Sequence, residues 1–331
     1  MSDVFRAAAP VRLDFAGGWT DVPPFSAREG GIVVSAAICQ YAHAEVRLGG
    51  VGLRLVAEDL GASLELPDEA ALTRPSQLGL LQAGLRLLPL GACALTTRSD
   101  APAGSGLGSS GALDVALVAA LSAARGERRD AREVAQLACR LERMEAGIPG
   151  GSQDQFTAAF GGVLRMEFHD PDVIVESLSL DPALLDELER RMLLVYTGAS
   201  HFSGTTIGRV MAAYERGDHA VTEALHGLRE VAERMVEALR AGDLARVGSL
   251  LDLNWQHQQI LDPGMCTPPM ARLGHAMRQA GGLGGKAAGS GAGGSMFFLG
   301  PDDPTEAARI AQALGGTLLP VRWASAGVQP C

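Results

Sequence analysis

The sequence predicts an α+β protein of two lobes. Segments with alternating apolar residues, typical of strands, and segments with apolar residues three or four positions apart, typical of helices, occur in both halves of the chain. They do not alternate strictly, which disfavours a doubly wound parallel sheet. The chain has 331 residues, and because domains commonly hold about 100–200 residues, two domains are expected. The second half begins near residue 170.

The elements of the first half follow from apolar spacing and from helix-capping residues. Strands are expected at 3–16, 31–48, 51–66 and 91–99, and helices at 76–89, 110–124 and 130–146. Asp130 suits the N-cap of the last of these helices, since a carboxylate can accept the free N–H groups there. The segment 147–154 and the pair Gly161-Gly162 are interpreted as loops that close this half.

The second half is expected to be richer in helix. Helices are predicted at 181–191, 204–240, 243–261, 268–280 and 304–314, and strands at 192–197, 295–299 and 317–323. Asp181 and Pro182 mark the start of the first helix, because proline is favoured at the first helical position. A glycine-rich run at 281–294 precedes the strand SMFFL.

Composition narrows the classes of protein. Lys+Arg is 28 and Asp+Glu is 38, so the net charge is −10, which disfavours a nucleic-acid partner that needs clustered cations. No apolar stretch is long enough to span a membrane, and no secretory leader is evident. The five cysteines are widely spaced without a metal-binding pattern. We expect a cytoplasmic protein with reduced thiols that needs neither nucleic acid nor membrane.

The most specific motif is a glycine-serine loop that leads directly into an apolar helix. It runs through Pro102, Gly104, Ser105, Gly106, Leu107, Gly108, Ser109 and Ser110. The free N–H groups and the positive dipole end of a helix favour an anion at this place. An ordinary loop with Ser109 or Ser110 as N-cap is the alternative. The spacing does not fit a Walker P-loop or a dinucleotide fingerprint.

A second motif, PVRLDFAGGWTD, joins charged residues on a strand to a glycine turn. Asp21 could accept hydrogen bonds from two hydroxyls of a polyol, and Trp19 could pack on a sugar face. Alternatively, Asp21 caps a turn before Pro23 and Arg12 is a solvated strand residue.

The third motif is the glycine-rich run 281–294, which contains Lys286, the only lysine of the chain. So many glycines are entropically costly in a mere connection. Close packing against a ligand or another loop is therefore favoured over a mobile linker.

Together, the three motifs in this order resemble those of the GHMP kinases, over nearly the whole chain. Within that superfamily the chain is most similar to the sugar 1-kinases, the branch of D-glycero-D-manno-heptose 7-phosphate kinase and L-fucokinase. Segments AGGWTDVPPF, PGGSQDQFTAAFGG and LDPG carry this likeness. The resemblance implies an S5-like N-terminal domain over 1–168, a ferredoxin-like C-terminal domain over 169–331, and an active site between them.

The resemblance also implies roles for individual residues. The loop from Pro102 to Ser110 would bind the phosphates of ATP. Asp154 would activate the accepting hydroxyl, the anomeric one, and its place in a glycine-flanked loop would suit close approach to substrate. Arg12 would contact the transferred phosphoryl group and favour the ionised form of Asp154. The sugar would be held by residues of two segments, namely Trp19, Thr20, Asp21, Gly151 and Gln153.

A magnesium ion is also implied. Ser110 and Glu142 would supply its oxygen ligands, which suit a hard cation. Glu145, about one helical turn further on, is the competing candidate for the acidic ligand.

Some residues depart from the sugar-kinase pattern and leave the substrate open. Trp255 is followed by Gln256-His257-Gln258 instead of lysines, and Thr197-Gly198 lacks the following arginine. The missing lysines disfavour a phosphorylated heptose, because its phosphate should need cations, whereas GGSQDQFTAAFGG favours the heptose kinases. A kinase for a free sugar such as fucose, a non-sugar GHMP kinase of the mevalonate type and a non-catalytic regulator are the alternatives. The expected partner is a small sugar or sugar phosphate, bound by a monomer or homodimer.

Overall fold

Two β-sheets organise the computed structural model, which describes residues 3–198 and 203–330. Within these residues the first sheet has the order β12-β1-β2-β5-β3-β4, with β6 paired to β2 and β7 to β6. Its strands are β1 (Val4–Ala16), β2 (Gly31–Leu48), β3 (Leu53–Ala57), β4 (Ala62–Leu66), β5 (Cys93–Ser99), β6 (Val163–His169), β7 (Asp172–Ser177) and β12 (Gln329–Pro330). The second sheet has the order β11-β8-β10-β9. It comprises β8 (Met192–Tyr196), β9 (Gly284–Ala287), β10 (Ser295–Leu299) and β11 (Thr317–Leu319).

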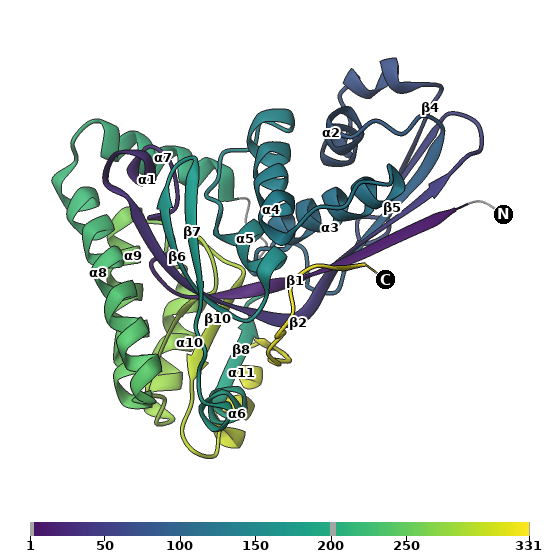
Figure 1. Ribbon diagram of the computed structural model, residues 1–331. Helices are drawn as coiled ribbons and strands as arrows, with labels where there is room; N and C mark the ends of the chain where they lie inside the picture. Colours follow the sequence, from purple (N-terminus) through teal and green to yellow (C-terminus); the bar gives the residue numbers. More distant parts are fainter. Residues whose placement is uncertain (1–2, 199–202, 331) are drawn as a thin grey trace.

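Helices surround both sheets. Those of the first half are α1 (Phe25–Glu29), the 3-10 turn η1 (Glu69–Thr73), α2 (Gly79–Leu87), α3 (Ser109–Ala124), α4 (Ala131–Arg140), the π-helical turn η2 (Leu141–Glu145) and α5 (Gln153–Phe160). Those of the second half are α6 (Pro182–Arg191), α7 (Ser203–Glu215), α8 (His219–Ala241), α9 (Leu244–Leu261), α10 (Pro268–Gln279) and α11 (Thr305–Ala313). Figure 1 shows α8 and α9 at one end of the molecule and β4 with α2 at the other.

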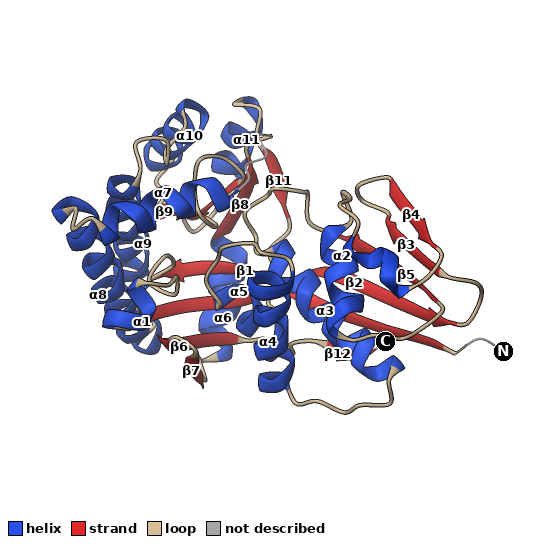
Figure 2. Ribbon diagram, turned by 90° about the horizontal axis from the view of Figure 1, so that it is seen from above, coloured by secondary structure: helices blue, strands red, loops and turns tan. Residues whose placement is uncertain are grey.

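The long strands β1 and β2 form the centre, and Figure 2 shows β1, β2 and β6 running side by side. Helices α3 and α5 from the first half and α8 from the second all contact β1 and β2. Every residue of β1 from Ala7 to Ala16 is therefore buried. This run is apolar apart from Arg12 and Asp14, so β1 carries two charged side chains into the interior.

Residues from both halves of the chain share each of the two apolar cores. Leu13 and Phe15 of β1 belong to one cluster with Val231 of α8 and Phe297 of β10. The Phe15 and Phe297 rings lie 5.7 Å apart between centroids. The second cluster is built mainly from the second half, but it also includes Trp19, Val22 and Phe25. The lobes are thus joined by buried apolar contacts.

Most predicted elements are confirmed, and two of the predicted helix caps are as expected. Asp130 accepts a hydrogen bond from Glu133 N and forms a capping box with it at the start of α4. Asp181 accepts from Ala183 N at the start of α6, with Pro182 at the first position. The N-cap of α3, by contrast, is Gly108 in the left-handed conformation, so neither Ser109 nor Ser110 caps that helix.

Several boundaries differ from the prediction. The predicted strand 51–66 is the β3–β4 hairpin, and the predicted helix 204–240 is divided at Gly217, whose φ is +75°, into α7 and α8. The predicted helix 130–146 changes after Arg140 into the π-helical η2. The run 281–294 contains the strand β9, and the strand predicted at 317–323 ends as β11 at Leu319.

The sequence prediction missed α1, α5 and the β6–β7 hairpin. The first sheet thus continues to Ser177, beyond the predicted boundary at 168/169, and is joined by β12 from the end of the chain. Among the described helices, none is both long and apolar enough to cross a membrane.

Candidate active site

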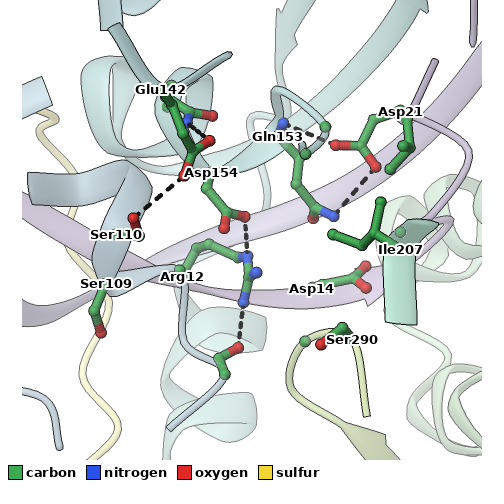
Figure 3. Close-up of a pocket in the computed structure, with 18 of the residues that line it drawn as sticks. Arg12, Asp14, Asp21, Ser109, Ser110, Glu142, Gln153, Asp154, Ile207 and Ser290 are labelled. Carbon is green, nitrogen blue, oxygen red and sulfur yellow. Dashed lines mark hydrogen bonds and ion pairs between the residues drawn. The ribbon is translucent and has the colours of Figure 1, made fainter. Parts of the chain in front are cut away.

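A cavity of about 550 Å³ lies where the first motif, the turn after β1, the start of α5 and the third motif meet. Figure 3 shows Arg12, Asp14, Asp21, Glu142 and Asp154 around it. Further lining residues come from the glycine-serine loop (Gly104, Ser105, Gly106, Gly108, Ser109, Ser110), from 148–155, and from Gly289 and Ser290. The cavity therefore gathers residues from both halves of the chain.

The glycine-serine loop uses its glycines to turn tightly before α3. Gly104, Gly106 and Gly108 have φ of +67°, +75° and +74°, values that favour glycine. Helix α3 begins at Ser109, so its first N–H groups have no partner within the helix, and both Ser109 and Ser110 line the cavity. Pro102 and Leu107 do not line the cavity. Leu107 is fully buried, and its carbonyl accepts a hydrogen bond from Arg12 N at 2.9 Å.

Arg12 connects three parts of the cavity wall. Its Nε donates to Asp154 Oδ1 at 2.7 Å, and its Nη1 donates to the carbonyls of Gly106 at 2.8 Å and Ala288 at 2.9 Å. Only 6% of its side chain is exposed, so the solvated-strand alternative is wrong. The guanidinium fixes Asp154 relative to both glycine-rich loops.

Asp154 stands in the first turn of α5, not in a loop as expected. A Cβ built at Gly111 would come 2.5 Å from Asp154 Cβ, and one at Gly108 would come 3.0 Å from Asp154 Cγ. These two glycines let the carboxylate approach the start of α3. Asp154 remains 27% exposed, so it faces the cavity while Arg12 holds one oxygen.

Behind Asp154, a second acidic group adjoins the start of α3. Glu142 of η2 accepts from Ser110 Oγ at 3.2 Å and from Gln155 Nε2 at 2.7 Å. Burial, reinforced by the Asp154 carboxylate, raises the pKa of Glu142 to about 7. Asp114 of α3 is fully buried beside it, and burial followed by repulsion from Glu142 raises the pKa of Asp114 well above its usual value.

Glu145 has different surroundings. It does not line the cavity, and its carboxylate pairs with Arg140 at 3.6 Å. The π-helical η2 separates the two acids, because a wider turn than the α-helix changes which residues share a face. Of the two candidates, only Glu142 lies with Ser110.

Asp21 caps α5 from across the fold. Its Oδ2 accepts from Ser152 N at 2.9 Å and from Gln153 N at 3.0 Å, and its Oδ1 lies 3.4 Å from Gln153 Nε2. A Cβ at Gly151 would come 1.8 Å from Oδ2, so only glycine fits there. Burial, with smaller effects of Asp154 and Asp14, raises the pKa of Asp21 to about 6. Asp21 thus combines a cavity position with a structural role.

Trp19 and Thr20 face different surroundings. Trp19 has φ of +84°, is 5% exposed and lines the cavity. Thr20 is fully buried outside the lining, where its hydroxyl donates to Gly17 O at 2.7 Å and accepts from Ile32 N at 3.1 Å. The expected sugar contact by Thr20 is therefore not supported, because this hydroxyl stabilises the turn.

The glycine-rich run 281–294 packs directly on the glycine-serine loop. A Cβ at Gly289 would come 2.4 Å from Gly106 O, and Ser295 N donates to Ser105 O at 2.7 Å. This close approach explains the glycines better than a mobile linker. Lys286 is fully buried, and its Nζ donates to Asp14 Oδ2 at 2.8 Å and to Asp14 O at 2.6 Å.

Sequence reasoning left four of these polar residues without a role, namely Asp14, Asp114, Gln155 and Lys286. A signal existed for Asp114, which lies four residues after Ser110 and hence on the same helix face. None existed for the Asp14–Lys286 pair, whose members are 272 residues apart.

Comparisons with known proteins agree with this geometry. Residues 77–162 match the GHMP kinases N terminal domain and residues 235–318 the GHMP kinases C terminal domain. The D-glycero-alpha-D-manno-heptose 7-phosphate kinase of Campylobacter jejuni is 30% identical over 93% of this chain and 92% of its own length. A bifunctional fucokinase/GDP-fucose pyrophosphorylase of Arabidopsis thaliana is 28% identical over 90% of this chain, which spans only 30% of that protein.

Solved structures show the same fold. A D-glycero-D-manno-heptose 1-phosphate kinase from Bacteroides thetaiotaomicron superposes with a TM-score of 0.80, 27% identity and 99% coverage of both chains. The relatives named here are kinases. The chain belongs to the GHMP kinase family, whose members use ATP, and within it is similar to heptose phosphate kinases and fucokinases.

Proposed function

We propose that this protein is a sugar 1-kinase, which transfers the γ-phosphoryl group of ATP to the anomeric hydroxyl of a sugar or sugar phosphate. Its substrate would most resemble D-glycero-D-manno-heptose 7-phosphate, the substrate in the name of the Campylobacter jejuni relative. The carrying observation is the position of Asp154. Its carboxylate is held by Arg12 at 2.7 Å, packs against the start of α3 and faces the cavity that Asp21 and Trp19 also line.

The glycine-serine loop binds the triphosphate. Backbone N–H groups between Gly104 and Ser110 donate to phosphate oxygens, and the dipole of α3 adds to the attraction. No lysine side chain takes part, since Lys286 is buried against Asp14. The main chain therefore supplies most of the phosphate contacts, with Ser105, Ser109 and the Arg12 guanidinium beside them.

Asp154 acts as the general base. Its carboxylate accepts the proton of the anomeric hydroxyl as the hydroxyl oxygen attacks the γ-phosphorus in line with the leaving oxygen. Arg12 orients the carboxylate through Nε. Because Nη1 is bonded to the two loop carbonyls, the same residue also sets the distance between the base and the phosphate site.

Ser110 and Glu142 would hold Mg²⁺. The donor set fits: a hydroxyl and a carboxyl group 3.2 Å apart, with the carboxyl groups of Asp114 and Asp154 nearby. The described residues contain no cluster of three or more His, Cys, Asp or Glu placed to hold a metal alone. That agrees with Mg²⁺, which commonly takes one or two protein ligands plus phosphates and water. When bound, the ion offsets charge on the β- and γ-phosphate oxygens.

The sugar lies between Trp19, Asp21, Gly151 and Gln153. Asp21 and Gln153 offer oxygens to ring hydroxyls, and Trp19 lines the same cavity. Gly151 lets the start of α5 lie directly against Asp21. Thr20 is left out of this set because its hydroxyl is used by the backbone.

A kinase of a free sugar, like the fucokinases, is the second candidate, and the charge of the cavity favours it. Among the described lining residues, four carboxylates (Asp14, Asp21, Glu142 and Asp154) accompany a single cationic side chain, Arg12. Arg12 Nη1 already donates two hydrogen bonds to backbone carbonyls, those of Gly106 and Ala288. An uncharged sugar meets less repulsion here than one that carries a phosphate.

Turnover of defined sugars distinguishes these proposals. Purified protein with Mg-ATP is offered D-glycero-D-manno-heptose 7-phosphate, L-fucose, D-galactose and mevalonate, and ADP release is measured. We expect release with one of the sugars, and a phosphate at C1 of the product by NMR. Release with mevalonate alone contradicts the sugar assignment, and nucleotide binding without release on any acceptor supports a regulator.

Asp154→Asn tests the base within the same assay. We expect kcat to fall at least about 100-fold, while Mg-ATP binding measured by calorimetry changes little. Glu45→Gln is the matched control: Glu45 meets Arg6 Nε at the same 2.7 Å and is 31% exposed, but lies outside the cavity. Near-normal kcat in Asp154→Asn would refute the role of Asp154.

A further inference from the structure

Buried polar atoms without a protein partner gather at this cavity. Among the described residues, ten buried side-chain nitrogen or oxygen atoms have none, and six belong to residues that line the cavity: Asp14, Trp19, Ser105, Ser109, Gln153 and Gln155. Buried polar groups are nearly always hydrogen-bonded, so a cluster of unpaired ones calls for an explanation. A polar ligand in the cavity would offer partners to those of these atoms that it reaches.

Asp14 is the most constrained of the six. It is 2% exposed, and Lys286 holds its carboxylate through Oδ2 at 2.8 Å and its carbonyl at 2.6 Å. The second carboxylate oxygen, Oδ1, has no partner. Burial of a charge is costly unless it is paired and hydrogen-bonded. Lys286 pairs the charge of Asp14 and bonds one carboxylate oxygen, but it leaves the other oxygen without a hydrogen bond.

The turn after β1 locks this carboxylate in place. A Cβ at Gly18 would come 2.2 Å from Asp14 Oδ2 and 3.0 Å from Gln153 Nε2, so only glycine allows the turn to lie on both. Figure 3 shows Asp14 to the right of Arg12 and above Ser290, on the side of the view that also holds Gln153 and Asp21. Asp14 therefore lines the part of the cavity that we assign to the sugar.

We propose that Asp14 determines sugar specificity: its Oδ1 accepts a hydrogen bond from a ring hydroxyl, and Lys286 is the positioning residue that holds the carboxylate. This inference rests on the proposed sugar kinase function. The unpaired Trp19 Nε1 and Gln153 Oε1 add a donor and an acceptor near the same ring. The ligand they select is a polyol that presents a hydroxyl donor to Asp14.

Asp14→Asn reverses the hydrogen-bonding character of this position. Because Lys286 can only donate, the new amide must turn its oxygen toward Nζ, which leaves NH₂ in the place of Oδ1. The acceptor for the sugar becomes a donor. A hydrogen bond to a charged group implies that KM for the sugar rises about 10- to 100-fold, while KM for ATP changes less than about 2-fold.

Deoxyfluoro analogues reveal whether the protein recognises one particular ring hydroxyl of the sugar as a hydrogen-bond donor. L-Fucose and D-glycero-D-manno-heptose 7-phosphate are compared with their mono-deoxyfluoro analogues, in which a hydroxyl donor is replaced by fluorine, using whichever sugar the wild type phosphorylates. The wild type should lose about 10- to 100-fold in kcat/KM on one analogue. In Asp14→Asn the same analogue should lose less than about 3-fold, since the partner is already gone.

A double variant guards against misfolding. Asp14→Leu with Lys286→Met replaces the ion pair by apolar groups of similar size, a change that buried pairs often tolerate, and it leaves no hydrogen-bond acceptor at position 14. It should show the same loss of analogue discrimination. Asn254→Ala is the control: Asn254 Oδ1 accepts from Gly17 N at 3.0 Å across the lobes but lies outside the cavity lining. Its ratio between sugar and analogue should match the wild type.

Two results would overturn the inference. Wild-type turnover of a sugar with unchanged KM and unchanged analogue ratios in both Asp14 variants refutes the role of Asp14 and leaves the kinase assignment intact. Absence of turnover on every sugar by the wild type refutes the kinase assignment, and this inference with it.

Discussion

Asp21 shows how a single residue can serve the fold and the site at a cost. Two backbone N–H groups at the start of α5 donate to its Oδ2, which is favourable for the helix. Yet the side chain is buried, near Asp154 and Asp14, and its pKa is raised to about 6. The ionised carboxylate is therefore less stable in the folded protein than in the unfolded chain. A charge retained against this cost is consistent with a ligand-binding role.

The raised pKa predicts how stability depends on pH. Between the ordinary value of 3.8 and about 6 the folded protein binds more protons at Asp21 than the unfolded chain, so this residue makes the free energy of unfolding decrease as pH rises from 4 to 6. The effect is on the order of 3 kcal/mol at most. Asp21→Asn keeps an oxygen for the N–H groups of α5 and should lose this decrease.

Urea unfolding of the wild type and of Asp21→Asn, both without ligands, at pH 4, 5, 6 and 7 measures the difference in their free energies of unfolding. Other titrating groups are common to both and cancel in the comparison. We expect the free energy of unfolding of Asp21→Asn, minus that of the wild type, to be larger above pH 6 than at pH 4. Identical pH profiles would show that Asp21 is not buried as a charged group.

At the scale of elements, the site depends on two glycine-rich segments in direct contact. Gly289 follows β9 and lies against Gly106, in the loop that opens α3. Gln258 Nε2 donates to Gly289 O at 2.7 Å, so α9 supports the same contact from behind. The glycine-serine loop is consequently shaped by the second half of the chain as well as by its own glycines.

Gly289→Ala should separate these segments. The added Cβ would lie 2.4 Å from Gly106 O, a backbone atom that cannot move without displacing the loop. We expect KM for ATP to rise at least about 10-fold, since the N–H groups lose their alignment with the phosphates. Gly79→Ala is the control, because a Cβ there meets nothing within 4 Å. An unchanged KM for ATP in Gly289→Ala would mean that the contact does not shape the nucleotide site.

Elements whose signals are local could be predicted from the sequence. Helix α3 is long and apolar and follows a distinctive loop, and α4 carries its own capping box with Asp130 and Glu133. Helix α5 could not be, because it is short, lies between glycines and receives its cap from Asp21, 131 residues away. Asp154 was consequently expected in a loop.

In the candidate site, too, residues with a local sequence signal could be predicted, whereas residues that meet only through long-range contacts could not. Motif residues such as Arg12, Asp154 and Ser110 were identified because their neighbours in sequence resemble a known pattern. Lys286 and Asp14 meet only in the folded chain, so no pattern could pair them. Thr20 has a hydroxyl that suits a sugar, but the backbone of the turn uses it.

At the scale of the whole molecule, each of the two apolar cores contains residues of both halves. Phe15 of β1 packs on Phe297 of β10, and Trp19 and Phe25 belong to the cluster that also holds Trp255 of α9. Polar contacts reinforce this, since Arg12 and Asp14 both bond to the segment around β9. The two lobes that form the cavity are thus held together by shared burial, with the candidate site at their junction.

Shared cores predict that the lobes unfold together. Separation would expose apolar side chains in both clusters, and the free energy of burial scales with apolar area. In urea, we expect loss of helix measured by circular dichroism and hydrogen-exchange labelling of β2 and α9 peptides to give one midpoint. A fragment ending after β7 should remain unfolded, because Leu13 and Phe15 lose their partners in α8 and β10. Separate midpoints for β2 and α9, or a cooperatively folding fragment, would instead show that each lobe is stable alone, so that the cavity lies between independent bodies.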